Sequence, residues 1–299
     1  MKPILRSIHL IGLSLMIFSK PSFAQITTLE QVTIFSSRLK NPIVFDVKYD
    51  TNNIYFNVRN NSQFPYMLEL NFNEFSNLSP VVFDKKTIVL PGINKLFTFK
   101  IINKNEAPNL AYKSKYYLAN INSGVERFSP YLVPIGKNRI VEFVQAKQDS
   151  STKIFTDHFV MSIGDTVFSA RKGIVTALPD NADELDRIMS GSLEIRHDDG
   201  TIALYLGLNP EIKFVKIGQK VFPSQPIGRI GDLKFLVFKV FEIIDDGEIA
   251  SFDITYIGPN NKLLSSRNIR GLKVDYPNEI IIKEMSKREA SKYKKNSLF

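Results

Sequence analysis

Hydrophobic and polar residues alternate along several short stretches between residues 41 and 123. Each stretch has the period of two that is expected of a half-buried strand, and clusters of Asn, Asp, Ser and Thr separate the stretches as turns would. Tyr66, Leu68, Leu70 and Phe72, for example, fall on one face of a single strand. Short strands at such spacing, with almost no helical periodicity, favour a small antiparallel β-sandwich. The predicted strands are residues 43–49, 54–58, 66–72, 87–90, 96–102 and 115–121.

The second half of the chain is again rich in predicted strands, here separated by frequent glycines that suit tight turns. Residues 128–151, which contain two prolines and end in a polar run, form the predicted junction between the halves. Residues 181–189 are the one helical candidate within this half. From residue 278 onward a helix-compatible tail carries six Lys or Arg residues, which predicts either a solvated tail or an anion-binding arm.

The first 24 residues have the organisation of a secretory signal peptide. A basic start is followed by an apolar run over residues 8–18, and small residues stand at Ser22 and Ala24. A membrane anchor is the alternative, but this run is shorter than the roughly 20 residues that a spanning helix needs. We therefore expect cleavage after Ala24, no transmembrane anchor, and a periplasmic or secreted protein.

Composition narrows the chemistry that the chain can support. With no cysteine among its 299 residues, the protein can form neither a disulfide framework nor a Cys-ligated metal site. Loss of Lys2, Arg6 and Lys20 with the signal would leave 36 basic against 30 acidic residues, a net charge of +6. This surplus suits an anionic envelope polymer or an acidic partner. Nothing in the sequence indicates nucleic-acid binding, since aromatic residues in strands usually belong to cores.

Five motifs follow one another in order between residues 158 and 240. They are residues 164–175 (GDTVFSARKGIV), 193–201 (LEIRHDDGT) with 205–208 (YLGL), 215–221 (VKIGQKV), 225–228 (QPIG) and 235–240 (FLVFKV). Their order resembles that of the lysostaphin/LytM-type zinc peptidases, which cut peptide cross-links of the cell wall. The resemblance implies a mostly β protein whose C-terminal half is a LytM-like antiparallel sheet domain of the duplicated-hybrid-motif type.

The residues that carry the family's chemistry are replaced in this chain. The resemblance implies a zinc held by a histidine, an aspartate and the second histidine of an H-x-H motif, with two further histidines assisting the attacking water. Here His158 stands at the aspartate position, Gly207 replaces the histidine of the Y-x-H-L motif, and Phe235 and Val237 replace those of H-x-H. Residues 147–152, where the first histidine is expected, contain none. We therefore predict no metal, no cofactor and no catalytic residues.

The count of histidines supports this prediction. The chain has three histidines, and His9 would leave with the signal, so that His158 and His197 remain for a chemistry that uses four. A replacement zinc site from these two with Asp157 and Asp198 is the alternative. A serine triad built on His197 and Asp198 is not favoured, because any surface His beside an Asp would fit that pattern. An S-x-x-K site at residues 150–153 lacks the S-D-N and K-T-G partner motifs that such enzymes need.

The last motif, residues 235–240, predicts which side chains line the altered site. Strand alternation places Phe235, Val237 and Lys239 on one face, which in the family lines the catalytic groove. We therefore expect a vestigial groove formed by His158, Gly207, Phe235, Val237 and Lys239, either open to a ligand or closed into core. The predicted function is that of a catalytically inactive LytM-like protein of the cell envelope. It binds either peptidoglycan or an envelope protein, the second in the way that regulators of cell-wall amidases do. The alternative is an active endopeptidase with relocated zinc ligands.

The predicted organisation follows from these features. It comprises a signal peptide (1–24), a β-sandwich domain (25–135), a degenerate LytM-like domain (136–245), a strand extension (246–277) and a basic tail (278–299).

Overall fold

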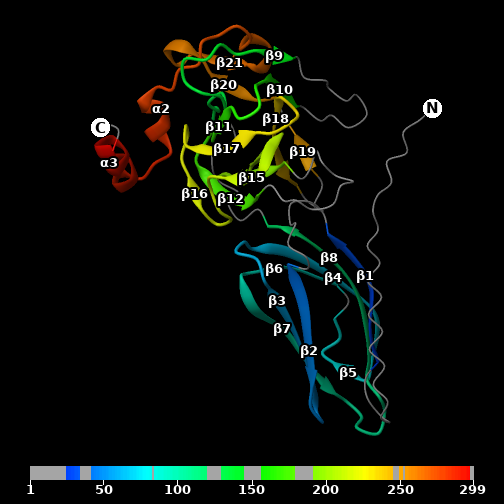
Figure 1. Cartoon of the computed structure of the whole chain (residues 1–299). Coiled ribbons are helices and arrows are strands. Elements are labelled where there is room, and N and C mark those ends of the chain that lie inside the picture. The colour runs from blue at the N-terminus through cyan, green and yellow to red at the C-terminus, as the bar shows by residue number, and fades with distance from the viewer. Residues whose placement is uncertain are drawn as a thin grey trace, which may run out of the picture. The chain divides into compact units, whose positions relative to one another are not determined.

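The computed structural model describes eight stretches of the chain. The described residues up to 119 form one compact unit, and those from 129 onward form a second. Both units are built mainly from antiparallel strands, so the expected mostly β fold is confirmed (Figure 1). The predicted signal peptide and the helical candidate at 181–189 lie outside the described residues. The described stretches are residues 25–33, 42–82, 84–119, 129–144, 156–178, 191–244, 249–251 and 253–296.

The first unit is a sandwich of two four-stranded sheets, ordered β1-β8-β4-β6 and β2-β3-β7-β5. Every pairing is antiparallel except that of β1 with β8. Phe56 of one sheet packs at 4.9 Å from Tyr112 of the other, which closes an aromatic core between them. The strands are β1 (Gln25–Thr33), β2 (Ile43–Tyr49), β3 (Asn53–Asn60), β4 (Tyr66–Ser76), β5 (Leu78–Ser79), β6 (Asp84–Val89), β7 (Gly92–Ile101) and β8 (Asn109–Leu118).

Alternation in β4 agrees with the sequence pattern. Tyr66, Leu68, Leu70 and Phe72 are all buried between the sheets, while the residues between them are more exposed. Burial of an apolar side chain at every second position lowers the free energy of the folded state, and this determines which face of the strand turns inward.

The second unit is organised around one sheet of eight strands, ordered β16-β12-β13-β14-β18-β10-β9, with β19 pairing to β18. A three-stranded sheet, β11-β17-β15, and the hairpin β20-β21 complete its strands. The elements are β9 (Phe143–Val144), β10 (Asp157–Val160), β11 (Thr166–Phe168), β12 (Gly173–Ala177), β13 (Leu193–Arg196), β14 (Ile202–Leu206), β15 (Leu208–Lys213), β16 (Lys220–Val221), β17 (Pro226–Ile230), β18 (Phe235–Ile243), β19 (Ile249–Ser251), β20 (Thr255–Ile257), η3 (Pro259–Asn261), β21 (Leu263–Ser265), η4 (Ser266–Asn268), α2 (Asn278–Lys283) and α3 (Lys287–Asn296).

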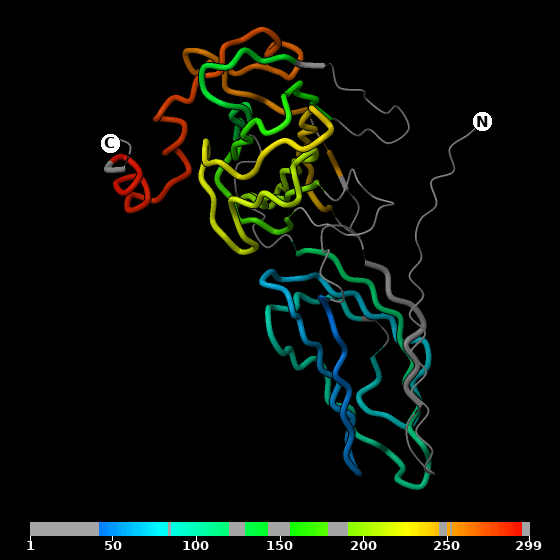
Figure 2. The backbone as a smooth tube through the Cα atoms, in the orientation of Figure 1, coloured from blue at the N-terminus to red at the C-terminus, as the bar shows by residue number. Residues whose placement is uncertain are grey.

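Residues 129–135, which the sequence analysis placed in the first domain, contribute to the core of the second unit. Tyr131, Leu132 and Ile135 are buried there. The amide of Tyr131 donates to the carbonyl of Thr255 at 2.9 Å, and the amide of Val141 donates to Leu272 at 2.8 Å. Figure 2 shows the two segments, green and orange, running side by side. Pro130 and Pro134, which suggested a linker in the sequence, lie among apolar residues. Those apolar residues become buried only because the distant segment 254–276 packs against them.

The predicted strand extension also belongs to this core. Ile254, Tyr256, Ile269 and Val274 are buried in the same cluster as the central sheet. The tail beyond it forms α2 and α3, and Ile281 anchors α2 by burial. Within the described part of the chain, no helix combines the length and the apolar character that crossing a bilayer requires.

Candidate functional site: the Lys239 face of the central sheet

One face of strand β18 packs into the core of the second unit, and the opposite face carries residues of the predicted groove. Leu236, Phe238 and Val240 point into the core and are fully buried. The alternate residues Phe235, Val237, Lys239 and Phe241 fall on the opposite face of the strand, because successive side chains of a strand point to opposite sides. Together with His158 of β10 we call these four residues the Lys239 face.

The register of the neighbouring strands gathers the predicted groove residues on this face. Val237 lies opposite His158 on β10 and opposite Leu206 on β14. Gly207 follows directly after Leu206 and lies against the backbone of Phe235. The five residues expected to form the vestigial groove are therefore close together, and they differ in exposure: Val237 is only 9% exposed, whereas Phe235 and Lys239 are half-buried.

Gly207 has no room for a side chain. Its φ is +99°, a left-handed backbone conformation that L-residues rarely adopt. A Cβ atom added there would also lie 2.3 Å from the carbonyl oxygen of Phe235, well inside van der Waals contact. The position that holds a histidine in the family is closed by backbone here.

His158 packs against an aromatic side chain of the same face. Its ring stacks on that of Phe235, with centroids 6.0 Å apart and planes 17° from parallel. Its Nε2 atom lies 3.4 Å from the Thr156 hydroxyl oxygen. Burial lowers the pKa of His158, because a charged imidazole is less favourable away from water. Burial therefore favours the neutral form of the imidazole.

Lys239 is a half-buried cation on the Lys239 face. Its Nζ atom lies 5.3 Å from the centre of the Phe241 ring. Among the described residues no Asp or Glu forms an ion pair with it. Burial lowers its pKa, since desolvation disfavours the ammonium form.

His197 lies on the other side of the sheet, away from His158. Its Nδ1–H donates to the carbonyl oxygen of Lys172 at 2.7 Å, and its ring contacts Tyr131 in the core at 5.4 Å. Burial, followed by the nearby charge of Arg171, lowers the pKa of His197 to about 4. The two histidines therefore cannot act on one ligand.

The residues at the positions of the family's zinc ligands and catalytic histidines, together with His197, do not form a zinc site in the part of the chain that the structure describes. Phe235 and Val237 have no ligand atom, Gly207 has no side chain, and His197 is held in the core on the opposite face from His158. In the part of the chain that the structure describes, no three His, Cys, Asp or Glu side chains come close enough to hold a metal ion. Zinc hydrolases use three protein ligands and a water.

A buried ion-pair network, absent from the sequence analysis, lies on the core side of the sheet. Arg171, 3% exposed in its side chain, binds Asp199 at 2.6 Å and Glu284 at 2.5 Å. Burial alone would raise the pKa of Asp199, but Arg171 and hydrogen bonds from Thr201 outweigh burial and lower it. The network joins the β11–β12 connection to the β13–β14 turn and to the residue after α2.

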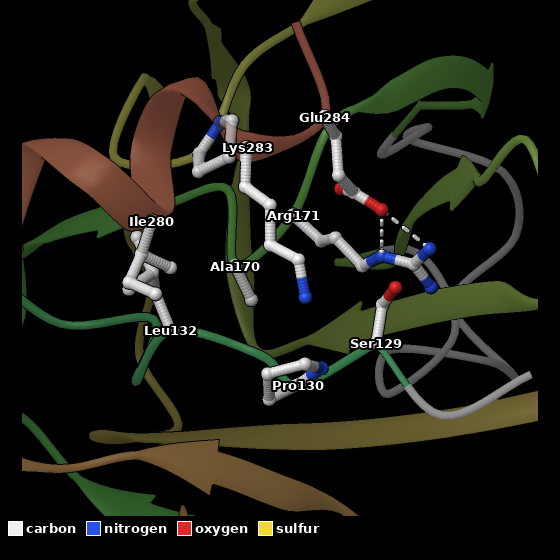
Figure 3. A pocket seen from close by; sticks show the side chains of 9 residues that line it. Ser129, Pro130, Leu132, Ala170, Arg171, Ile280, Lys283 and Glu284 are labelled. Atoms are coloured by element: carbon white, nitrogen blue, oxygen red, sulfur yellow. Dashed lines mark hydrogen bonds and ion pairs between the residues drawn. The ribbon is translucent and has the colours of Figure 1, made fainter. Parts of the chain in front are cut away.

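A small pocket beside this network has no residue in common with the Lys239 face. Its volume of about 20 Å³ is roughly that needed for one water molecule. Figure 3 shows Arg171 reaching Glu284 at its edge, with Ile280 and Lys283 of α2 on one side. The pocket therefore lies where α2 packs against the rest of the second unit. Its lining residues are Ser129, Pro130, Leu132, Ala170, Arg171, Pro223, Ile280, Lys283 and Glu284.

No family model matches the chain, and no curated protein matches it either. Among solved structures, the M23 metalloprotease pseudoalterin from the deep sea is similar at 13% identity, with a TM-score of 0.32, over 51% of this chain and 98% of its own. Csd3 of Helicobacter pylori is similar at 12% identity, with a TM-score of 0.30, over 86% of this chain and 78% of its own. A zinc-containing peptidase of Vibrio cholerae is similar at 14% identity, with a TM-score of 0.26, over 78% of this chain and 86% of its own. At these scores the likeness carries no conclusion about activity.

Proposed function

We propose that this chain is a secreted, catalytically inactive protein of the bacterial cell envelope that binds peptidoglycan without hydrolysing it. Its motifs resemble those of LytM-type peptidases, and its Lys239 face stands where that resemblance places the catalytic groove. The observation that carries the proposal is the replacement of this site: backbone fills the space at Gly207, Val237 presents carbon where the resemblance requires a zinc-ligand nitrogen, and Phe235 presents carbon where it requires a catalytic histidine.

Such a face suits binding better than hydrolysis. A hydrolase must activate water, which needs a metal or a base within reach of the substrate. Among the described residues this face has no metal-binding cluster, and its one imidazole, His158, has Thr156 and Phe235 beside it rather than a carboxylate that would orient it as a base. Apolar side chains around a few polar groups are the usual lining of a ligand site.

The area of this face favours a peptide strand of the cell wall over a folded protein. A stable protein interface buries roughly 800 Å² on each partner. On the Lys239 face, Val237 and Phe241 are already 9% and 2% exposed, which leaves few side chains with area to bury. A protein-binding regulator of cell-wall enzymes is therefore the weaker candidate.

Charge gives a second reason to prefer the polymer. Helix α3 turns Lys287, Arg288, Lys292 and Lys294 toward solvent, while Glu289 is bound by Lys220 at 3.0 Å. A cationic surface attracts anionic envelope polymers at long range.

The test uses residues 25–299, supplied with zinc and incubated with purified sacculi. The proposal predicts that the protein sediments with the sacculi and that no soluble wall fragments appear in the supernatant. Release of fragments would support the active endopeptidase with relocated ligands. Protein that stays in the supernatant would overturn the binding role.

A further inference from the structure

Half-buried Lys239 differs from Arg171, a more deeply buried cation of this unit. Arg171 is neutralised by two carboxylates, Asp199 and Glu284. The ammonium of Lys239 lies against the Phe241 ring at 5.3 Å and has no carboxylate partner among the described residues. Removing a charge from water without a counter-charge is unfavourable, and a cation–π contact recovers only part of that free energy.

Two acidic residues of the other strands of this sheet, Asp157 and Glu194, form no ion pair with Lys239. Asp157 lies on the opposite face of β10, where Tyr256 and Ser266 donate to it at 2.6 and 2.7 Å. Glu194 of β13 is opposite Leu204, which in turn is opposite Lys239, so an intervening strand separates it from the ammonium. The counter-charge is therefore not supplied by these strands.

The side chains beside Lys239 can act as hydrogen-bond donors. Asp157 is opposite Phe238, so the same register continued by one residue places Thr156 beside Lys239. The Thr156 hydroxyl lies 3.4 Å from His158 Nε2 on this face. The Lys239 ammonium and the one donor of the Thr156–His158 pair that is not used between them together match the acceptor oxygens of a carboxylate.

We infer that Lys239, with Thr156 and His158 beside it, binds the carboxylate of an extended peptide that lies across β18, and that the stem peptides of peptidoglycan supply this carboxylate. The inference rests on the proposed function and adds to it the group that is recognised. Phe235, stacked on His158, supplies the apolar contact next to that carboxylate.

The experiment measures binding of three probes to residues 25–299 by calorimetry: a synthetic stem peptide with free carboxylates, the same peptide with every carboxyl group amidated, and an acidic linear L-peptide of equal charge. Lys239→Met removes the charge and keeps the length of the side chain. Lys216→Met is the matched control, because Lys216 is exposed on a turn outside the Lys239 face.

We expect Lys239→Met to weaken binding of the free stem peptide by about tenfold or more, the usual loss when a charge-assisted hydrogen bond is removed. Lys216→Met should bind as the wild type does, and amidation of the peptide should weaken binding to the wild type but change little for Lys239→Met. The melting temperature of Lys239→Met should not fall, since the substitution removes a half-buried charge that has no carboxylate partner among the described residues.

Equal binding of the free and amidated peptides, or unchanged binding by Lys239→Met, would overturn the inference. If the acidic L-peptide bound as tightly as the stem peptide, the assignment to peptidoglycan would be wrong. Any of these results combined with sedimentation on sacculi would leave the proposed function standing, whereas failure to sediment would remove the proposed function itself.

Discussion

The carbonyl oxygen of Phe235 occupies the space that a side chain at Gly207 would need, 2.3 Å from the position of a Cβ atom. The backbone of Gly207 also has φ of +99°. Both features arise where the chain turns from β14 into β15 while it lies against the start of β18. The consequence is that Gly207 accepts no substitution without movement of the backbone.

We therefore expect Gly207→Ala to lower the free energy of unfolding by at least about 2 kcal/mol, through steric overlap and a strained backbone. Gly136→Ala is the control: its added Cβ would be no closer than 3.6 Å to its neighbours, so its effect should stay within about 1 kcal/mol. Thermal or urea unfolding of both variants measures this. Similar stability of the two would contradict the described geometry.

Histidines restored at Phe235 and Val237 should not create a hydrolase. Catalytic groups act as a unit, so partial repair recovers little activity. Gly207 cannot accept a third histidine, and residues 147–152 offer none at the position of the family's first ligand. The measurement is release of soluble fragments from sacculi in the presence of zinc, and activity of the double variant above that of the wild type would refute this expectation.

Much of the fold could be predicted from the sequence, because apolar and polar residues alternate along a strand that has one buried face. The pattern of residues 66–72 correctly predicted which side of β4 is buried, and the parity of residues 235–240 correctly separated Lys239 from the core residues Leu236 and Phe238. Each of these inferences needed only the period of a strand.

The ion-pair network could not be predicted in the same way. Arg171 binds Glu284, which is 113 residues away in the chain, through a contact made only when α2 docks. No spacing rule connects such residues. The role of segment 129–135 could not be predicted for a related reason, since its burial depends on residues that follow 250.

Arg171 should be essential to stability. Arg171→Met would leave Asp199, whose side chain is fully buried, without its counter-charge, which typically costs about 3–5 kcal/mol. Lys137→Met is the control, because both partners of the Lys137–Asp275 pair are more than half exposed and such pairs contribute about 0–1 kcal/mol. Urea unfolding distinguishes the two, and equal effects would show that the network does not stabilise the fold.

Acid should destabilise the protein through His197. Burial, with Arg171 nearby, lowers its pKa to about 4 from 6.5, while the facing carboxylates Asp198 and Asp199 oppose this shift. The unfolded chain therefore takes up the proton first as pH falls. Stability is full above pH 6.5 and lost progressively toward pH 4, by roughly 2–3 kcal/mol from this group.

His197→Asn keeps a donor near the Lys172 carbonyl and removes the titration. Its free energy of unfolding should therefore fall less between pH 7 and pH 4 than that of the wild type, as measured by urea unfolding at each pH. An identical pH dependence would show that other groups determine the loss of stability in acid.

The most direct test of a binding face on β18 is the fraction of protein that sediments with sacculi as their concentration is raised. The double variant Phe235→Ala/Lys239→Met removes the aromatic and the cationic contacts, and Phe214→Ala/Lys216→Met removes a Phe that is 41% exposed and an exposed Lys elsewhere in the same unit. We predict saturable sedimentation of the wild type and of Phe214→Ala/Lys216→Met. For Phe235→Ala/Lys239→Met we predict that binding is weaker by about tenfold or more. Sedimentation of Phe235→Ala/Lys239→Met at the wild-type level would contradict the assignment of the Lys239 face as the binding site.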